Sequence, residues 1–131
     1  MPTDSVRIRL VADTNRLLWL FFSLKGRISP AVYFLAGLLL LVIQMFLLYR
    51  FTLAPEQSTA QGGWALAFGA MVFTAAWSNI ALTAKRLHDF GRPAGWALIT
   101  LVVGFIVFIV LSFIRGDAGP NRYGSTTNAP A

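Results

Sequence analysis

Three long apolar runs interrupt an otherwise polar chain and predict membrane-spanning helices at about residues 31–49, 64–84 and 95–114. The first run contains 12 Leu, Ile, Val or Phe residues, and the third contains 14 with no charged residue. At about 1.5 Å per residue, each run is long enough to cross roughly 30 Å of hydrocarbon. The pattern therefore indicates an all-α membrane protein with three transmembrane helices.

The second run is the least apolar, with only 6 Leu, Ile, Val or Phe residues among many Ala, Thr and Ser. At 100° per residue its small side chains share one narrow stripe, formed by Ala67, Ala70, Thr74, Ser78 and Ala81. Small residues let helix backbones approach closely in lipid, so we expect this helix at the centre of the bundle. The stripe is also a candidate surface for a protein partner or a second copy of the chain. Asn79 either donates hydrogen bonds across helices or belongs to an ion or substrate site.

The N-terminal region carries a shorter apolar stretch, LLWLFFSL at residues 17–24, between Arg16 and Lys25. It is about half the length needed to cross a bilayer, and it predicts a short helix lying flat at the membrane interface, with a buried core strand as the alternative. We expect residues 1–19 to be an N-terminal extension, residues 20–124 a single multi-pass membrane domain, and residues 125–131 a disordered tail.

Charge adds an orientation to this picture. The chain has a net charge of +6, no cysteine and only 12% charged residues, which fits basic residues beside a cytoplasmic leaflet better than nucleic-acid binding. With three spans, the N-terminal region and the 85–93 loop share one side, which holds eight basic residues: Arg7, Arg9, Arg16, Lys25, Arg27, Lys85, Arg86 and Arg92. The other side holds Arg50, Arg115 and Arg122. The positive-inside rule then predicts a cytoplasmic N-terminus and an external C-terminal tail.

The stretch KRLHDFGRPAGW, residues 85–96, lies between the second and third runs and contains the only histidine of the chain. His88 and Asp89 are neighbours on a helical turn and point about 100° apart, so they do not form a catalytic pair with each other. One histidine, no cysteine and five scattered carboxylates are too few ligands for a zinc site. Walker and dinucleotide-binding glycine patterns are absent. We expect no enzyme activity, no metal and no cofactor.

An electrostatic role fits this stretch better. Lys85, Arg86 and Arg92 are predicted to form a cationic collar, worth about 1 kcal/mol per basic residue against an anionic leaflet. The collar either only orients the protein or also binds a lipid headgroup or a protein partner. The first hypothesis is a non-enzymatic membrane scaffold or accessory subunit. The second is a small oligomeric transporter or channel component that uses Asn79, His88 and Asp89.

Three motifs in a fixed order carry a family resemblance: FSLKGRIS at 22–29, KRLHDFGRPAGW at 85–96 and GPNRYG at 119–124. In this order and spacing the chain resembles the domain-of-unknown-function 805 family of small bacterial inner-membrane proteins, over about residues 20–124. The resemblance implies a multi-pass protein of the bacterial inner membrane and no established activity. The family pattern has two adjacent aromatic residues after the loop. Here Gly95 stands in place of the first, and Trp96 is the second. The positions that match the pattern are Gly26, Arg27, Arg86, Leu87, His88, Asp89, Gly91, Trp96, Gly119, Asn121, Arg122, Tyr123 and Gly124. The predicted lipid- or partner-binding residues are Arg27, Lys85, Arg86, His88, Asp89, Arg92, Trp96, Asn121, Arg122 and Tyr123.

Overall fold

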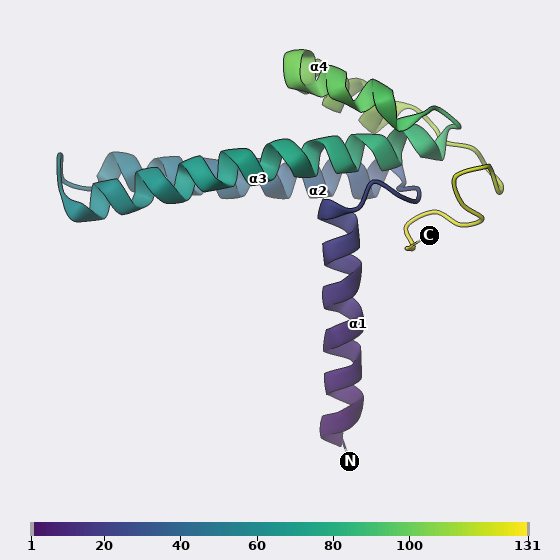
Figure 1. Cartoon of the computed structure of the whole chain (residues 1–131), viewed down its shortest axis with the longest axis horizontal. Coiled ribbons are helices and arrows are strands. Elements are labelled where there is room, and N and C mark those ends of the chain that lie inside the picture. The colour runs from purple at the N-terminus through teal and green to yellow at the C-terminus, as the bar shows by residue number, and fades with distance from the viewer. Residues whose placement is uncertain (1, 131) are drawn as a thin grey trace.

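The structure is a computed structural model that describes residues 2–130 (Figure 1). Helices form every regular element of these residues, and two isolated β-bridges occur outside them. The elements in chain order are α1 (Pro2–Phe22), α2 (Pro30–Leu53), α3 (Thr59–Asp89), the 3₁₀-helix η1 (Ala94–Ile99) and α4 (Thr100–Phe113).

Helices α2 and α3 form an antiparallel hairpin that lies along the long axis of the molecule (Figure 1). Serine side chains begin both helices: Ser29 Oγ accepts from the Val32 N–H at 3.3 Å, and Ser58 Oγ accepts from the Gln61 N–H at 3.0 Å. Each hydroxyl satisfies a backbone donor that a helix N-terminus leaves without a partner. The helices therefore start before the apolar runs do, and α3 also continues past its run to Asp89.

Helix α3 lies at the centre of the bundle, as predicted, because it packs against α1, α2, η1 and α4. The small-residue stripe divides along its length. Ser78 and Ala81 are fully buried, whereas Ala70 and Thr74 remain exposed. The small side chains therefore allow close packing only in the half of α3 that leads to Asp89.

The third apolar segment folds back on itself. Inside α4, Val103 has non-helical dihedral angles of φ −126° and ψ 37°, which break the helix. The segment begins next to the end of α3, to which residues 90–93 connect it. Its other end returns to the same place, as shown by the hydrogen bond from Arg86 Nε to the Leu111 carbonyl at 2.9 Å. Figure 1 shows α4 above only the part of α3 that leads to this end.

Three helical segments are long and apolar enough to cross a membrane, in agreement with the sequence prediction. The predicted position of the C-terminal tail is wrong, however. The Asp117 N–H donates to the Asp89 carbonyl at 2.6 Å, so the tail lies at the same end of the bundle as the 85–93 loop. Hydropathy measures apolar length and does not distinguish a straight helix from a helical hairpin.

Helix α1 projects away from the hairpin, across its long axis (Figure 1). It includes most of the predicted short helix at 17–24 but begins at Pro2, so the N-terminal extension is helical too. Its C-terminal end contacts α3: Trp77 Nε1 donates to the carbonyl of Phe22, the last residue of α1, at 3.1 Å, and Lys85 Nζ donates to the carbonyl of Ser23, the next residue. The rest of α1 is exposed along its length, including Ile8 at 70%.

Large apolar side chains cover the outside of the spans. Leu66, Phe73 and Val102 are between 78% and 85% exposed. Monomeric soluble proteins rarely expose apolar surface on this scale, whereas lipid tails solvate it without penalty. The exposed faces of these helices are therefore the surfaces that suit a bilayer.

Candidate functional site

The charged end of α3 is buried. Residues 81–89 all lie inside the structure, and the side chains of Lys85 and Arg86 have no exposed surface. Asp89 is 3% exposed and His88 is 7% exposed. Charged groups are rarely buried to this extent unless they are paired, so their partners decide what the site can do.

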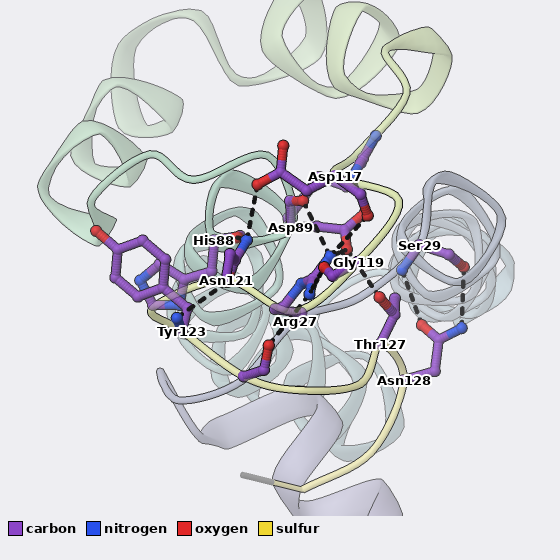
Figure 2. Close-up of polar contacts among 12 residues, drawn as sticks. Arg27, Ser29, His88, Asp89, Asp117, Gly119, Asn121, Tyr123, Thr127 and Asn128 are labelled. Carbon is purple, nitrogen blue, oxygen red and sulfur yellow. Dashed lines mark hydrogen bonds and ion pairs between the residues drawn. The ribbon is translucent and has the colours of Figure 1, made fainter.

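Arg27, which precedes α2, is the centre of the site (Figure 2). Its Nη2 lies 3.1 Å from Asp89 Oδ1, and its Nε donates to the same oxygen at 3.2 Å. Its Nη1 donates to the carbonyls of Gly119 and Gly124 at 2.8 and 3.1 Å, and its Nη2 to the carbonyl of Asp117 at 2.9 Å. One guanidinium thus joins the start of α2, the end of α3 and the C-terminal segment, which its planar set of donors makes possible.

Asp89 lies between two guanidinium groups. Arg86 Nη1 donates to its Oδ2 at 2.7 Å, opposite the contact with Arg27, and Thr127 Oγ1 donates to its Oδ1 at 2.9 Å. The other donors of Arg86 reach the carbonyls of Leu111 and Ile114. These carbonyls are at the C-terminal end of α4, where the helix dipole is negative and favours a cation.

His88 and Asn121 fix the loop that follows α4. The His88 ring stacks on Tyr123 with ring centroids 4.0 Å apart and planes 7° apart. His88 Nδ1 is 3.0 Å from the Gly26 carbonyl, and because a carbonyl only accepts, Nδ1 carries the proton. Asn121 Nδ2 donates to the His88 carbonyl at 2.8 Å and to Asp117 Oδ2 at 2.9 Å.

Two glycines are required by close approach. Gly26 has φ +100°, and a Cβ there would lie 2.8 Å from Trp19 Cζ2. A Cβ on Gly116 would collide with the Asp89 carboxylate. Gly26 therefore lets the backbone pass against the Trp19 indole, and Gly116 lets it pass against Asp89, which a larger residue would prevent.

Residues that follow Gly124 contact the start of α2. Asn128 Oδ1 accepts from the Ser29 N–H at 2.8 Å, and the Asn128 N–H donates to the Arg27 carbonyl at 2.8 Å. We expected disorder over residues 125–131; within residues 125–130 the chain instead makes these defined contacts, and Ala131 is outside the described residues.

Residues 21–125 match a protein family described as "Protein of unknown function (DUF805)". The chain belongs to the DUF805 family. It is 29% identical over 107 residues to inner membrane protein YhaH of Escherichia coli K12, covering 79% of this chain and 86% of YhaH. It is 42% identical over 48 residues to inner membrane protein YhaI of the same strain, covering 35% of this chain and 41% of YhaI. No solved structure matches the chain.

The DUF805 motifs meet at the end of α3, in what we call the polar cluster. Of the predicted binding residues, the structure brings together Arg27, Arg86, His88, Asp89, Asn121 and Tyr123, with Lys85 beside them at the end of α1. It leaves Arg92 and Trp96 outside the cluster, exposed, and places Arg122 at its edge, 4.7 Å from the centre of the Tyr123 ring.

The prediction that Lys85 and Arg86 form a cationic collar against the leaflet is therefore wrong for both residues, because they are buried; for Arg92, which is exposed, it stays a prediction. Their donors reach protein carbonyls and a carboxylate, so burial is stabilised without headgroups. Sequence reasoning also missed Asp117, Thr127 and Asn128. Asp117 lies in a Gly- and Pro-containing stretch typical of a turn, GDAGPNRYG, and nothing in the sequence near Thr127 or Asn128 indicates a partner so far back in the chain.

The charged groups of the polar cluster are paired with one another or with backbone carbonyls. Its carboxylate is shared by two guanidinium groups, and its histidine has a backbone partner on one nitrogen and an aromatic ring on its face. Within residues 2–130, no group of three or more His, Cys, Asp or Glu side chains is close enough to hold a metal ion. Asn79 lies elsewhere, beside a cavity that His88 and Asp89 do not line.

Proposed function

We propose that the protein is a non-enzymatic scaffold or accessory subunit of the inner membrane, with both termini in the cytoplasm and a basic face on the lipid headgroups. The distribution of charge in the folded chain supports this proposal most directly. Because the third segment folds back, Arg115 and Arg122 join the other basic residues at one end, and Arg50 alone among the eleven lies at the opposite end. Ten basic residues at one end against one at the other favour a cytoplasmic location for the end with ten.

The basic face consists of the exposed basic residues outside the polar cluster. Three basic residues are buried in or beside the cluster, and the exposed ones at this end are Arg7, Arg9, Arg16, Lys25, Arg92, Arg115 and Arg122. At about 1 kcal/mol for each basic residue near an anionic leaflet, seven such residues give a substantial preference for anionic lipid. Helix α1, which carries three of them and lies across the spans, is proposed to rest in the headgroup region (Figure 1).

The names of the relatives support the membrane assignment, because YhaH and YhaI are both inner membrane proteins. The internal pairing of the cluster supports a non-enzymatic role. A scaffold also needs a surface for its partner, for which we propose the exposed part of the α3 stripe, Ala70 and Thr74. An Ala70→Cys variant is expected to form disulfide-linked dimers in the membrane if that partner is a second copy.

Cysteine labelling tests the orientation, because the chain has no cysteine of its own. We expect an impermeant maleimide to label Glu56→Cys in intact cells from which the outer membrane has been removed, and to label Ser125→Cys only after lysis. Both positions are exposed, so access to reagent depends on sidedness. Labelling of Ser125→Cys in the intact cells would overturn the proposed orientation.

Native mass spectrometry tests the basic face. The protein is expected to retain phosphatidylglycerol in preference to phosphatidylcholine, and the triple variant Arg92→Gln, Arg115→Gln, Arg122→Gln should lose roughly 3 kcal/mol of that preference, or about a hundredfold in affinity. Arg50→Gln is the matched control at the opposite end and should leave the preference unchanged. Equal losses in the two variants would contradict a lipid-binding face at this end.

A further inference from the structure

A cavity of about 240 Å³ lies between α2, α3 and the fold-back of the third segment. Its polar lining consists of Tyr33, Gln44, Asn79, Thr83 and Thr100, and the other lining residues are aliphatic, aromatic or glycine, so no charged side chain lines it. Asn79 precedes the end of α3 by ten residues, which places the cavity about 15 Å from that end. The cavity is therefore at the depth of the hydrocarbon rather than the headgroups.

The amide of Asn79 has no partner at this depth. Its side chain is half-buried and makes no hydrogen bond within residues 2–130. Gln44 Nε2 donates to the Leu40 carbonyl of its own helix at 3.2 Å, and its Oε1 accepts no hydrogen bond from the part of the chain that the structure describes. Unpaired amide groups are costly in hydrocarbon, where water does not compensate them.

The break in the third segment borders the same cavity. Thr100 and Gly104 both line it and flank the non-helical Val103. At membrane depth, non-helical backbone is tolerated where protein buries it or where it lines a polar cavity. Interrupted helices that meet polar side chains near the middle of a membrane are a recurring way to build ligand sites.

We propose that this cavity binds a quinone or quinol, an uncharged ligand that dissolves in the membrane and carries its oxygens on a six-membered ring. A cavity of roughly 150 Å³ accepts benzene, so the volume here leaves room for ring substituents. Tyr33 and Phe108, with ring centroids 5.5 Å apart, provide aromatic walls. The Asn79 amide both donates and accepts, which suits a carbonyl or a hydroxyl. Phe105 lines the cavity and is 75% exposed, so the cavity opens towards lipid, where a hydrocarbon tail would remain.

Native mass spectrometry of the full chain in detergent tests this binding with two probes. One probe is a benzoquinone with a decyl tail, and the other is decylbenzene, which has the same carbon skeleton without oxygens. We expect a one-to-one quinone adduct and binding of decylbenzene at least tenfold weaker. Absence of a quinone adduct, or equal binding of the two probes, would overturn the proposal.

Two variants connect the binding to this cavity. Asn79→Leu should weaken quinone binding at least tenfold while leaving the thermal midpoint of the free protein unchanged or higher, because the amide has no partner to lose. Gly104→Leu should block both probes by filling the cavity. Gly69→Leu is the matched control: a Cβ at either glycine meets nothing within 4 Å, but Gly69 does not line the cavity. Quinone binding that survives both Asn79→Leu and Gly104→Leu would place the ligand elsewhere.

Discussion

Replacing Asp89 by Asn tests whether the buried cluster holds the fold together. The substitution keeps the shape of the side chain and removes the charge that lies 3.1 Å from Arg27 Nη2 and 2.7 Å from Arg86 Nη1. The Asp89 side chain is only 5% exposed, so water does not replace the lost carboxylate. Breaking a buried ion pair by removing one partner costs about 3–5 kcal/mol. Two guanidinium groups lose the carboxylate that they share, so we expect a loss at the upper end of that range.

The assay is reversible unfolding of the purified protein in a mild detergent, titrated with denaturant and followed by tryptophan fluorescence. Asp117→Asn is the matched control, because its exposed carboxylate accepts one hydrogen bond from Asn121 and should be worth at most about 1 kcal/mol. A double-mutant cycle between Arg27→Gln and Asp89→Asn should give a coupling energy of about 1–3 kcal/mol. If Asp89→Asn costs no more than Asp117→Asn, the ion pairs do not stabilise the fold and the reasoning fails.

Two further substitutions separate backbone strain from ring stacking in the same assay. Gly26→Ala should lower the free energy of unfolding by about 1–3 kcal/mol, because φ is +100° and the new Cβ would lie 2.8 Å from Trp19. Gly119→Ala has open space around its Cβ and should stay within about 0.5 kcal/mol of the native chain. Similar losses in the two variants would contradict the strain argument. Tyr123→Leu should cost about 0.5–1.5 kcal/mol through its lost stacking on His88, and Tyr123→Phe should be neutral because its hydroxyl makes no hydrogen bond in the described residues. A loss in Tyr123→Phe as large as that in Tyr123→Leu would exclude stacking as the cause.

The spans were predictable because lipid imposes a simple requirement. A run of about 20 apolar residues satisfies its backbone internally and its side chains in hydrocarbon, whatever its neighbours are. That rule located α2 within a few residues at its start, where the structure places Ser29 as the N-cap and Pro30 in the first turn. It placed the end of α3 too early, because hydropathy treats Lys85 and Arg86 as residues that must face water.

The members of the cluster were predictable only in part. The motifs marked Arg27, Arg86, His88 and Asp89 as positions of interest, but their spacing along the chain does not show that Arg27 reaches Asp89. Whether a basic residue faces a headgroup or a carboxylate depends on partners that approach from distant parts of the sequence. For this reason the collar prediction was wrong for Lys85 and Arg86, which are buried, and stays a prediction for the exposed Arg92.

The sequence by itself determined that this protein is an all-helical membrane protein with three apolar segments, because the transfer of side chains into lipid depends on local composition. The tertiary structure decided that the third segment folds back, which puts the C-terminal tail beside the start of α2. It did so because a buried carboxylate needs cationic and hydroxyl donors around it, and these are separated from it by up to 62 residues. Hydrogen-bonding requirements of this kind are met in three dimensions, so no local pattern records them.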